Sequence, residues 1–327
     1  MIKKRKLGKS DLYVSEIGLG GWQLGAPVQI NNKPGTSFGG LDEDTAYRII
    51  TTALELGVTT FDTADIYSLG NSEIRLGNIL KDYRSDVQIF TKAGHVPGFP
   101  KWSIDYSYNH LISAIDRSLS RLQTDYVDLF QIHYPPNSEE DYVSIEKAFN
   151  SIKSDSKASY CGISVGIHYD KAIEIIKRGI VDCIQLYFTL IDPKPLETLL
   201  PLAKKNNIGI IVAEPLAQGF LTNKYKPGHV FPNDDIRHHA YPNELLQLKL
   251  ERSKQFEFLQ NSNRSLSQAS LAYILSREEI STCIPGVKSL EQLNSNVDAS
   301  TIRLSSDELK KISIIQNNWK EGFSKTG

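Results

Sequence analysis

Four side chains that can hold or move a proton stand at or just beyond the ends of short apolar runs. Asp62 follows VTTF, Lys92 follows VQIFT and His133 follows YVDLFQI, while Tyr67 comes shortly after Asp62. A tyrosine has an unperturbed pKa of roughly 10, so it is a weak acid near neutral pH. A neighbouring ammonium favours the phenolate and makes the phenol a better proton donor. These residue types therefore predict a proton-donating site in which Lys92 tunes Tyr67.

The same residues argue against several other chemistries. In a proton-donating site Asp62 balances the charge of Lys92, and His133 orients a substrate carbonyl by a hydrogen bond. No usual nucleophile–base pair stands at the strand ends, so transfer through a covalent intermediate is not indicated. Acidic pairs at glycosidase spacing are not evident there, and a metal site would need more than one histidine, so we expect no metal. Each residue alone also has an ordinary structural role, such as helix capping by Asp62, but their joint occurrence on successive strands favours chemistry.

The strands and helices that position these residues are predicted from two alternating patterns of apolar residues. Short apolar or β-branched runs alternate with segments of helical period, such as Ile112, Ile115, Leu119 and Leu122, which share one helix face. Such alternation predicts parallel strands with right-handed crossovers, and eight units favour an α/β fold of the closed (β/α)8 TIM-barrel type. The carboxyl ends of barrel strands surround one mouth, where we expect the four residues to meet. The eight predicted strands begin at Val14, Val58, Val87, Tyr126, Tyr160, Asp182, Ile208 and Ser281.

Two kinds of segment lie outside this rhythm. Residues 1–15 predict a short β-hairpin that closes the bottom of the barrel. Long polar loops, 23–40 and 223–243, follow the first and seventh strands on the face where barrel enzymes carry their sites. No Pro/Gly-rich linker divides the chain, so we expect a single domain over residues 1–327.

The composition limits which binding partners and which cellular compartment are expected. The 327 residues include 37 Lys+Arg and 38 Asp+Glu, a balance that offers no field for nucleic acid or an anionic membrane. No run approaches the roughly 20 apolar residues that span a bilayer. The three cysteines show no CxxC spacing and predict buried thiols in a reducing cytoplasm. The expected partner is a small molecule, and nothing in the composition indicates an oligomeric state.

Over nearly its whole length the chain resembles the aldo-keto reductase family. The matching stretches include GLGGWQLG, FDTADIYSLGNSEIRLG, FTKAG, SLSRLQTDYVDLFQIHYP, EPLAQGFLTNKY and IPGVKSLEQLNSN, in this order. The resemblance implies a barrel that reduces an aldehyde or ketone with NADPH, or catalyses the reverse oxidation. The family's catalytic tetrad falls on Asp62, Tyr67, Lys92 and His133, with Tyr67 as the general acid.

The resemblance also implies an NADP(H) site and a substrate pocket. Lys288, near the start of a predicted helix, is placed to face a 2′-phosphate, although a solvated helix start is the alternative. The implied cofactor-binding positions are Gly21, Trp22, Asp62, Ser164, Gln185, Pro215, Leu216, Gln218, Gly286, Val287, Lys288, Gln292 and Asn296. The implied substrate-pocket positions are Trp22, Tyr67, Trp102 and His133.

The chain departs from the family pattern at three cofactor positions. Val165 follows Ser164 where the family often has asparagine, Ala213 and Glu214 occupy the place of the aromatic that commonly stacks on the nicotinamide, and Ser295 replaces a frequent glutamate.

Alternative interpretations remain for the function and for a few residues. A sugar or sugar-nucleotide dehydrogenase on the same barrel is one functional alternative, and a non-catalytic nucleotide-sensing subunit is another. Trp319 is placed either to gate the pocket or to pack between helices, and His238 and His239 predict a solvated lid rather than a metal site.

Overall fold

Eight strands form one parallel sheet whose order follows the chain in the computed structural model. The structure describes residues 2–25, 29–30, 33–34, 40–97, 103–232 and 235–323. Each predicted run overlaps a strand of this sheet. The strands are β3 (Leu19–Gly20), β6 (Thr60–Asp62), β7 (Gln88–Ala93), β10 (Val127–Ile132), β11 (Ala158–Gly166), β12 (Cys183–Tyr187), β13 (Gly209–Ala213) and β14 (Ile280–Ile284).

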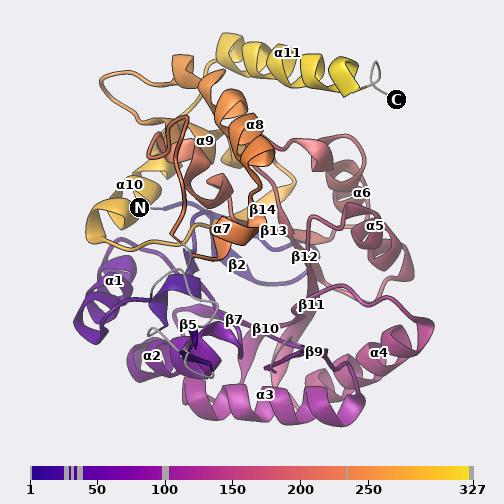
Figure 1. The fold of residues 1–327 in the computed structure, drawn as a ribbon. Helices are drawn as coiled ribbons and strands as arrows, with labels where there is room; N and C mark the ends of the chain where they lie inside the picture. Colours follow the sequence, from indigo (N-terminus) through magenta and orange to yellow (C-terminus); the bar gives the residue numbers. More distant parts are fainter. Residues whose placement is uncertain are drawn as a thin grey trace.

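The last strand meets the first, so that the sheet closes into a barrel (Figure 1). Bridges join Ile17 to Cys283 and Gly20 to Gly286, and the Gly18 amide donates to the Cys283 carbonyl at 2.8 Å. A Cβ at Gly20 would lie 2.7 Å from the Ile284 carbonyl oxygen, so this close approach requires glycine. The predicted (β/α)8 barrel is confirmed.

Helices cover the outside of the barrel (Figure 1). On α3 the predicted face is buried at Ile115, Leu119 and Leu122, and Gly179 ends α5 in a left-handed conformation with φ of 72°. The helices are α1 (Glu43–Glu55), α2 (Asn71–Leu80), α3 (Tyr108–Leu122), α4 (Glu139–Ser154), α5 (Tyr169–Arg178), α6 (Leu199–Lys205), α7 (Ile236–Ala240), α8 (Asn243–Lys254), α9 (Leu266–Leu275), α10 (Leu290–Asp298) and α11 (Ser306–Phe323). Of the described helices, none is long and apolar enough to cross a membrane.

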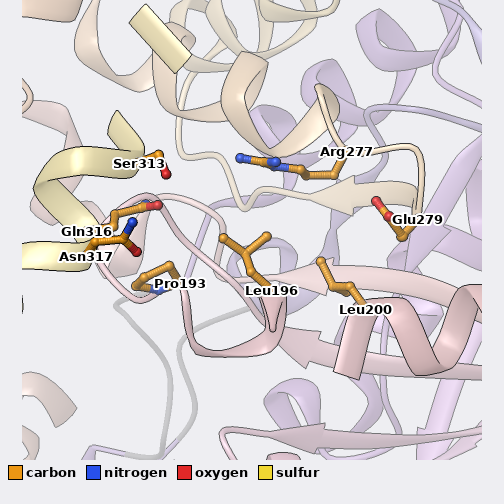
Figure 2. Close-up of a pocket in the computed structure, with 8 residues that line it drawn as sticks. All are labelled: Pro193, Leu196, Leu200, Arg277, Glu279, Ser313, Gln316 and Asn317. Atoms are coloured by element: carbon orange, nitrogen blue, oxygen red, sulfur yellow. The ribbon is translucent and has the colours of Figure 1, made fainter. Parts of the chain in front are cut away.

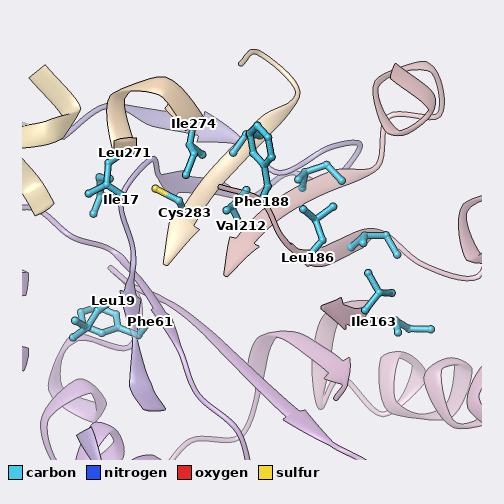
Figure 3. Packing of buried hydrophobic residues seen from close by; sticks show 14 of the residues in the cluster. Ile17, Leu19, Phe61, Ile163, Leu186, Phe188, Val212, Leu271, Ile274 and Cys283 are labelled. Atoms are coloured by element: carbon cyan, nitrogen blue, oxygen red, sulfur yellow. The ribbon is translucent and has the colours of Figure 1, made fainter. Parts of the chain in front are cut away.

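The core has an inner and an outer layer because successive strand side chains point to opposite faces. On the outer side, Cys283 and Val212 pack near Ile17, Leu271 and Ile274 (Figure 3). The three cysteines are buried free thiols, as predicted. The inner layer fills the barrel with Leu7, Val14, Phe90, Leu129, Cys183, Ile211 and Ile284.

An antiparallel hairpin of β1 (Lys4–Lys6) and β2 (Tyr13–Ser15) covers the bottom of the barrel. The Arg5 guanidinium donates to the carbonyls of Leu275, Arg277 and Ile280 at 2.6–3.1 Å and pairs with buried Glu16 at 2.9 Å. These carbonyls lie at or before the start of β14, so the hairpin occupies its predicted place.

The loops at the opposite end contain short elements of their own. Much of the predicted 23–40 loop lies outside the described residues, and α7 falls inside the segment predicted as a loop over 223–243. The short strands are β4 (Gln29–Ile30), β5 (Lys33–Pro34), β8 (His95–Val96) and β9 (Ser103–Ile104). The 3-10 turns among the described residues, in these loops and elsewhere in the chain, are η1 (Gly21–Leu24), η2 (Tyr67–Gly70), η3 (Lys81–Tyr83), η4 (Lys194–Leu196), η5 (Ala217–Thr222), η6 (Glu257–Leu259) and η7 (Ala299–Thr301).

Candidate active site

A cavity of about 960 Å³ opens at the carboxyl ends of the barrel strands. Lys92 and Val287 are buried and do not line it, and Trp102 lies outside the described residues. The other predicted site residues all line it: Gly21, Trp22, Asp62, Tyr67, His133, Ser164, Gln185, Pro215, Leu216, Gln218, Gly286, Lys288, Gln292 and Asn296. The structure thus brings residues from most of the chain to one place.

A buried ion pair lies at the inner end of this cavity. Lys92 Nζ lies 2.6 Å from Asp62 Oδ2, and it also donates to the Thr63 carbonyl at 2.8 Å and to the Tyr67 hydroxyl at 3.3 Å. The three ammonium protons therefore have three acceptors. Asp62 Oδ1 in turn accepts from Gln185 Nε2 at 2.9 Å and from Gln131 Nε2 at 3.5 Å. Gln131, fully buried two positions before His133, was missed by the sequence reasoning.

The backbone after Tyr67 adopts a left-handed turn. Ser68 and Leu69 have φ of 50° and 54°, and Gly70 has φ of 89°. Non-glycine residues in this region carry a cost of about 1 kcal/mol each or more, which the surrounding packing must offset. The turn aims the phenol at the ion pair, with Lys92 Nζ 4.9 Å from the ring centroid.

Two further rings, those of Trp22 and His95, lie against the phenol and its neighbour His133. The Trp22 ring lies edge-on to Tyr67 at 4.9 Å, His133 lies edge-on to Tyr67 at 5.5 Å, and His95 lies edge-on to His133 at 5.1 Å. The His133 amide donates to the Ala93 carbonyl at 2.8 Å, which ties the start of this loop to β7. His133 Nδ1 is buried and has no hydrogen-bond partner among the described residues.

Burial keeps both Tyr67 and His133 neutral. It raises the pKa of Tyr67 well above its usual value, and the charge of Asp62 acts in the same direction. The Tyr67 pKa thus stays high although Lys92 Nζ lies 3.3 Å from its hydroxyl, because burial and the Asp62 charge both disfavour the phenolate. Burial and the Lys92 charge lower the pKa of His133 well below its usual value. A protonated phenol and a neutral imidazole, each able to donate one hydrogen bond, are the result.

Three cations line the other end of the cavity, beside the start of α10. Lys288, Lys224 and Arg237 come together there, and burial together with the charges of Arg237 and Lys224 lowers the pKa of Lys288. Arg237 is held by Asp235 at 2.5 Å. Sequence reasoning missed Lys224 and Arg237, because both lie in a long loop whose path has no periodic signal.

The loop after β13 is tied down by a chain of polar contacts. Gln218 Nε2 donates to both carboxylate oxygens of Glu214 at 2.7–2.9 Å, and Gln218 Oε1 accepts from the Tyr241 hydroxyl at 2.8 Å. Arg237 donates to the Gln218 carbonyl at 3.1 Å. Burial raises the pKa of Glu214 to about 7. The sequence analysis identified Glu214 only as a departure from the family pattern and did not predict its contact with Gln218.

The structure also locates the other departures. Ala213, at the position of the expected stacking aromatic, pairs in register with Tyr187 on β12, and the Tyr187 ring lines the cavity. Tyr187 also lies near Gly166, where an added Cβ would be 3.7 Å from the ring. Val165 is fully buried and does not line the cavity, whereas Ser295 lines it.

Residues with alternative interpretations are placed as follows. The Trp319 ring packs against Phe256 at 5.7 Å and its Nε1 donates to Gln255 at 3.2 Å, so it packs between helices. His238 Nδ1 lies 2.8 Å from the Phe231 carbonyl, and the His239 side chain is outside the described part.

A second cavity, of about 260 Å³, lies beside α11 and the turn before β14, and none of the predicted site residues lines it (Figure 2).

Comparison with known proteins matches this arrangement to one family. The aldo/keto reductase family pattern covers residues 16–317. The chain is 32% identical to the oxidoreductase YqkF of Bacillus subtilis over 99% of both chains, and 32% identical to L-galactose dehydrogenase of Arabidopsis thaliana over 92% of this chain and 88% of that protein. The holo form of the aldo-keto reductase AKR11C1 from Bacillus halodurans superposes with a TM-score of 0.78 at 32% identity, covering 96% of each chain.

The parallel barrel, with polar side chains gathered at the carboxyl ends of its strands, has the architecture of a barrel enzyme. The chain belongs to the aldo/keto reductase family and is an NAD(P)H-dependent oxidoreductase.

Proposed function

We propose that this protein reduces an aldehyde or ketone to an alcohol with NADPH, or catalyses the reverse oxidation. The observation that carries the proposal is that Tyr67, Asp62 and His133 line one cavity, with the ammonium of buried Lys92 only 3.3 Å from the Tyr67 hydroxyl. The size of the cavity lies at the upper end of the roughly 300–1,000 Å³ typical of cofactor and ligand sites, and its cationic end suits phosphate groups.

Each of the four residues has a distinct task in this proposal. Tyr67 donates its proton to the carbonyl oxygen, and His133 donates a hydrogen bond that orients the same oxygen. The Lys92 ammonium stabilises the phenolate as it forms, since one of its protons already points to the Tyr67 oxygen. Asp62 holds that ammonium in place. A bound nicotinamide supplies the hydride for the carbonyl carbon, so that the C=O group gains one hydride and one proton.

The cationic end of the cavity favours NADPH over NADH. Lys288, Lys224 and Arg237 face a common space beside the start of α10, and the 2′-phosphate that distinguishes the two cofactors adds charge that these groups stabilise. Ser164 and Gln185 are proposed to contact the carboxamide. The Gln185 amide nitrogen is used by Asp62, which leaves its oxygen available to accept.

The test compares the wild type with Tyr67→Phe, which removes only the hydroxyl. Using a panel of small aldehydes and following NADPH oxidation, we expect kcat to fall by roughly 10²–10⁴. NADPH affinity, measured by quenching of tryptophan fluorescence, stays within about twofold of the wild type. Tyr83→Phe, at an exposed tyrosine on η3, is the matched control and retains full activity.

Two outcomes contradict this assignment. Equal turnover by Tyr67→Phe and wild type removes Tyr67 as the acid. Tight NADPH binding without oxidation by any aldehyde favours the nucleotide-sensing alternative. The relative named L-galactose dehydrogenase supports including sugars in the oxidation direction, which is the remaining alternative.

A further inference from the structure

We infer that Glu73, a buried carboxylate outside the barrel, is a positioning residue for the proposed reaction. Together with Thr91 and Arg121 it forms a group of contacts that we call the Glu73 clamp. The clamp fixes how far the Tyr67 hydroxyl lies from the Lys92 ammonium. Its three members do not line the cavity, so they act through other residues. The inference rests on the proposed function, in which this distance determines how well the acid works.

The segment that carries Tyr67 is joined at both of its ends to neighbouring residues of β7. Before the turn, the Asp65 amide donates to the Lys92 carbonyl at 3.0 Å. After the turn, Thr91 Oγ1 donates to Glu73 Oε1 at 2.5 Å. Tyr67 therefore lies in a short bridge over the strand that carries Lys92, and the two end contacts determine where the bridge sits.

Thr91 and Lys92 link the outside of the barrel to its inside. Successive strand side chains point to opposite faces, so Lys92 points into the barrel while Thr91 points outward to the helices. Both side chains are fully buried. A displacement of Glu73 relative to Thr91 is thus also a displacement of the Tyr67 segment relative to Lys92.

Arg121 completes the clamp from the neighbouring helix. Glu73 lies on α2 and Arg121 near the end of α3, and these two helices pack against each other outside the barrel (Figure 1). Arg121 Nε lies 2.6 Å from Glu73 Oε2, so each oxygen of this solvent-inaccessible carboxylate has a donor. A Cβ at Gly70 would lie 2.6 Å from Arg121 Cδ. The Arg121 side chain therefore contacts both the carboxylate and the end of the Tyr67 turn.

The turn depends on such contacts because its own backbone does not favour its shape. Ser68 and Leu69 have left-handed φ values of 50° and 54°, which persist only where the surrounding structure imposes them. The contact of the Tyr67 hydroxyl with Lys92, at 3.3 Å, is already near the upper limit for a hydrogen bond. A further increase of less than 1 Å therefore breaks this contact.

The experiment replaces Thr91 with valine, which has the same shape but a methyl group in place of the hydroxyl. A carbon and an oxygen need about 3.3–3.6 Å, whereas the present separation is 2.5 Å, so Glu73 must move by roughly 1 Å. We expect kcat for propanal reduction by NADPH to fall about tenfold to hundredfold, since a misplacement of this size costs that much in rate. KM for propanal and Kd for NADPH stay within about threefold of the wild type, because the cavity lining is unchanged.

Two controls distinguish positioning from a general loss of packing. Thr91→Ser keeps the hydroxyl and is expected to retain about half or more of the wild-type kcat. Thr282→Val, on β14, is the matched control and keeps full activity. Thr282 is as fully buried as Thr91, but its hydroxyl makes only a contact of 3.5 Å, to the Cys283 carbonyl.

A second measurement does not depend on turnover. In crystal structures of the wild type and Thr91→Val, we expect the distance from the Tyr67 hydroxyl to Lys92 Nζ to increase from 3.3 Å to about 4 Å or more. If Thr91→Val does not fold, Arg121→Met takes its place. The Arg121 side chain is 22% exposed, and its removal takes the other donor from Glu73, so both measurements are expected to change in the same direction.

The outcomes separate this inference from the proposed function. An unchanged kcat in Thr91→Val, an equal loss in Thr91→Ser, or a loss confined to KM overturns the inference and leaves the proposed function intact. Absence of turnover by the wild type with every aldehyde overturns the proposed function. In that case the distance between the Tyr67 hydroxyl and Lys92 still decides the inference, and an unchanged distance in the variant refutes it.

Discussion

Replacing Lys92 with methionine removes the cation of the buried pair with Asp62 and keeps an unbranched apolar side chain. In the wild type both side chains are almost completely inaccessible to solvent, and their charged atoms lie 2.6 Å apart. Removing one partner of such a pair leaves a buried carboxylate that keeps only its amide contacts to Gln185 and Gln131. The expected loss in the free energy of unfolding at pH 8 is about 3–5 kcal/mol.

The loss has a pH dependence whose sign follows from proton binding. Burial already raises the pKa of Asp62, and removing Lys92 raises it further, because the ammonium favours the ionised carboxylate. The folded variant then binds a proton at a pH where the unfolded chain has released it, so its stability falls as pH rises. The variant is therefore closest to the wild type near pH 5 and furthest from it at pH 8.

Urea unfolding at pH 5 and pH 8, followed by tryptophan fluorescence, measures both effects. The double variant Asp62→Asn, Lys92→Met removes the unpaired charge and is expected to be about 2 kcal/mol more stable than Lys92→Met at pH 8. A loss below about 1 kcal/mol at pH 8, or a double variant no more stable than the single one, would refute the reasoning that the pair is an ion pair in a poorly solvated site.

Three further changes test other parts of the molecule. Lys288→Met is expected to weaken NADPH binding about tenfold and NADH binding less than twofold, measured by fluorescence titration; an equal loss for both cofactors contradicts a 2′-phosphate contact. Burial raises the pKa of Glu214 from 4.5 to about 7. The folded state therefore holds a proton that the unfolded chain has released, and its stability falls as pH rises through this interval. Glu214→Gln is therefore expected to gain up to about 3 kcal/mol relative to the wild type between pH 4.5 and pH 7.5 in urea unfolding, and a constant difference rules this out. Gly77→Ala places a Cβ 2.5 Å from the Arg121 carbonyl oxygen between α2 and α3, and we expect a loss of roughly 1–3 kcal/mol, with a wild-type unfolding midpoint as the contrary result.

The barrel and the meeting of Asp62, Lys92 and His133 were predictable because strand periodicity marks where each strand ends. A residue at the carboxyl end of a parallel barrel strand must lie at the mouth, whatever its distance along the chain. The same argument placed Ser164 and Gln185 at the cavity, where the structure has them.

Residues that reach the cavity from loops were not predictable in this way. Lys224 and Arg237 lie in a long segment after β13, and their position depends on left-handed backbone at Gln218 and on contacts with Tyr225 and Asp235. The positions of His95, Tyr134 and His168, which also line the cavity, likewise depend on how three separate loops fold against one another. Neither hydrophobic period nor turn composition carries that information.

The hairpin at the base of the barrel has a consequence for the order of folding during synthesis. Arg5 contacts carbonyls 270–275 residues later in the chain, so its partners do not exist until nearly the whole barrel has been made. At roughly 5–20 residues per second, the hairpin waits on the order of 15–50 s after its own synthesis. During that time Leu7 and Val14 lack the Ile211 and Ile284 side chains that share their cluster in the finished molecule. A ribosome-bound chain that ends before β14 thus exposes the interior of its barrel, and the first residues made are among the last to find their places.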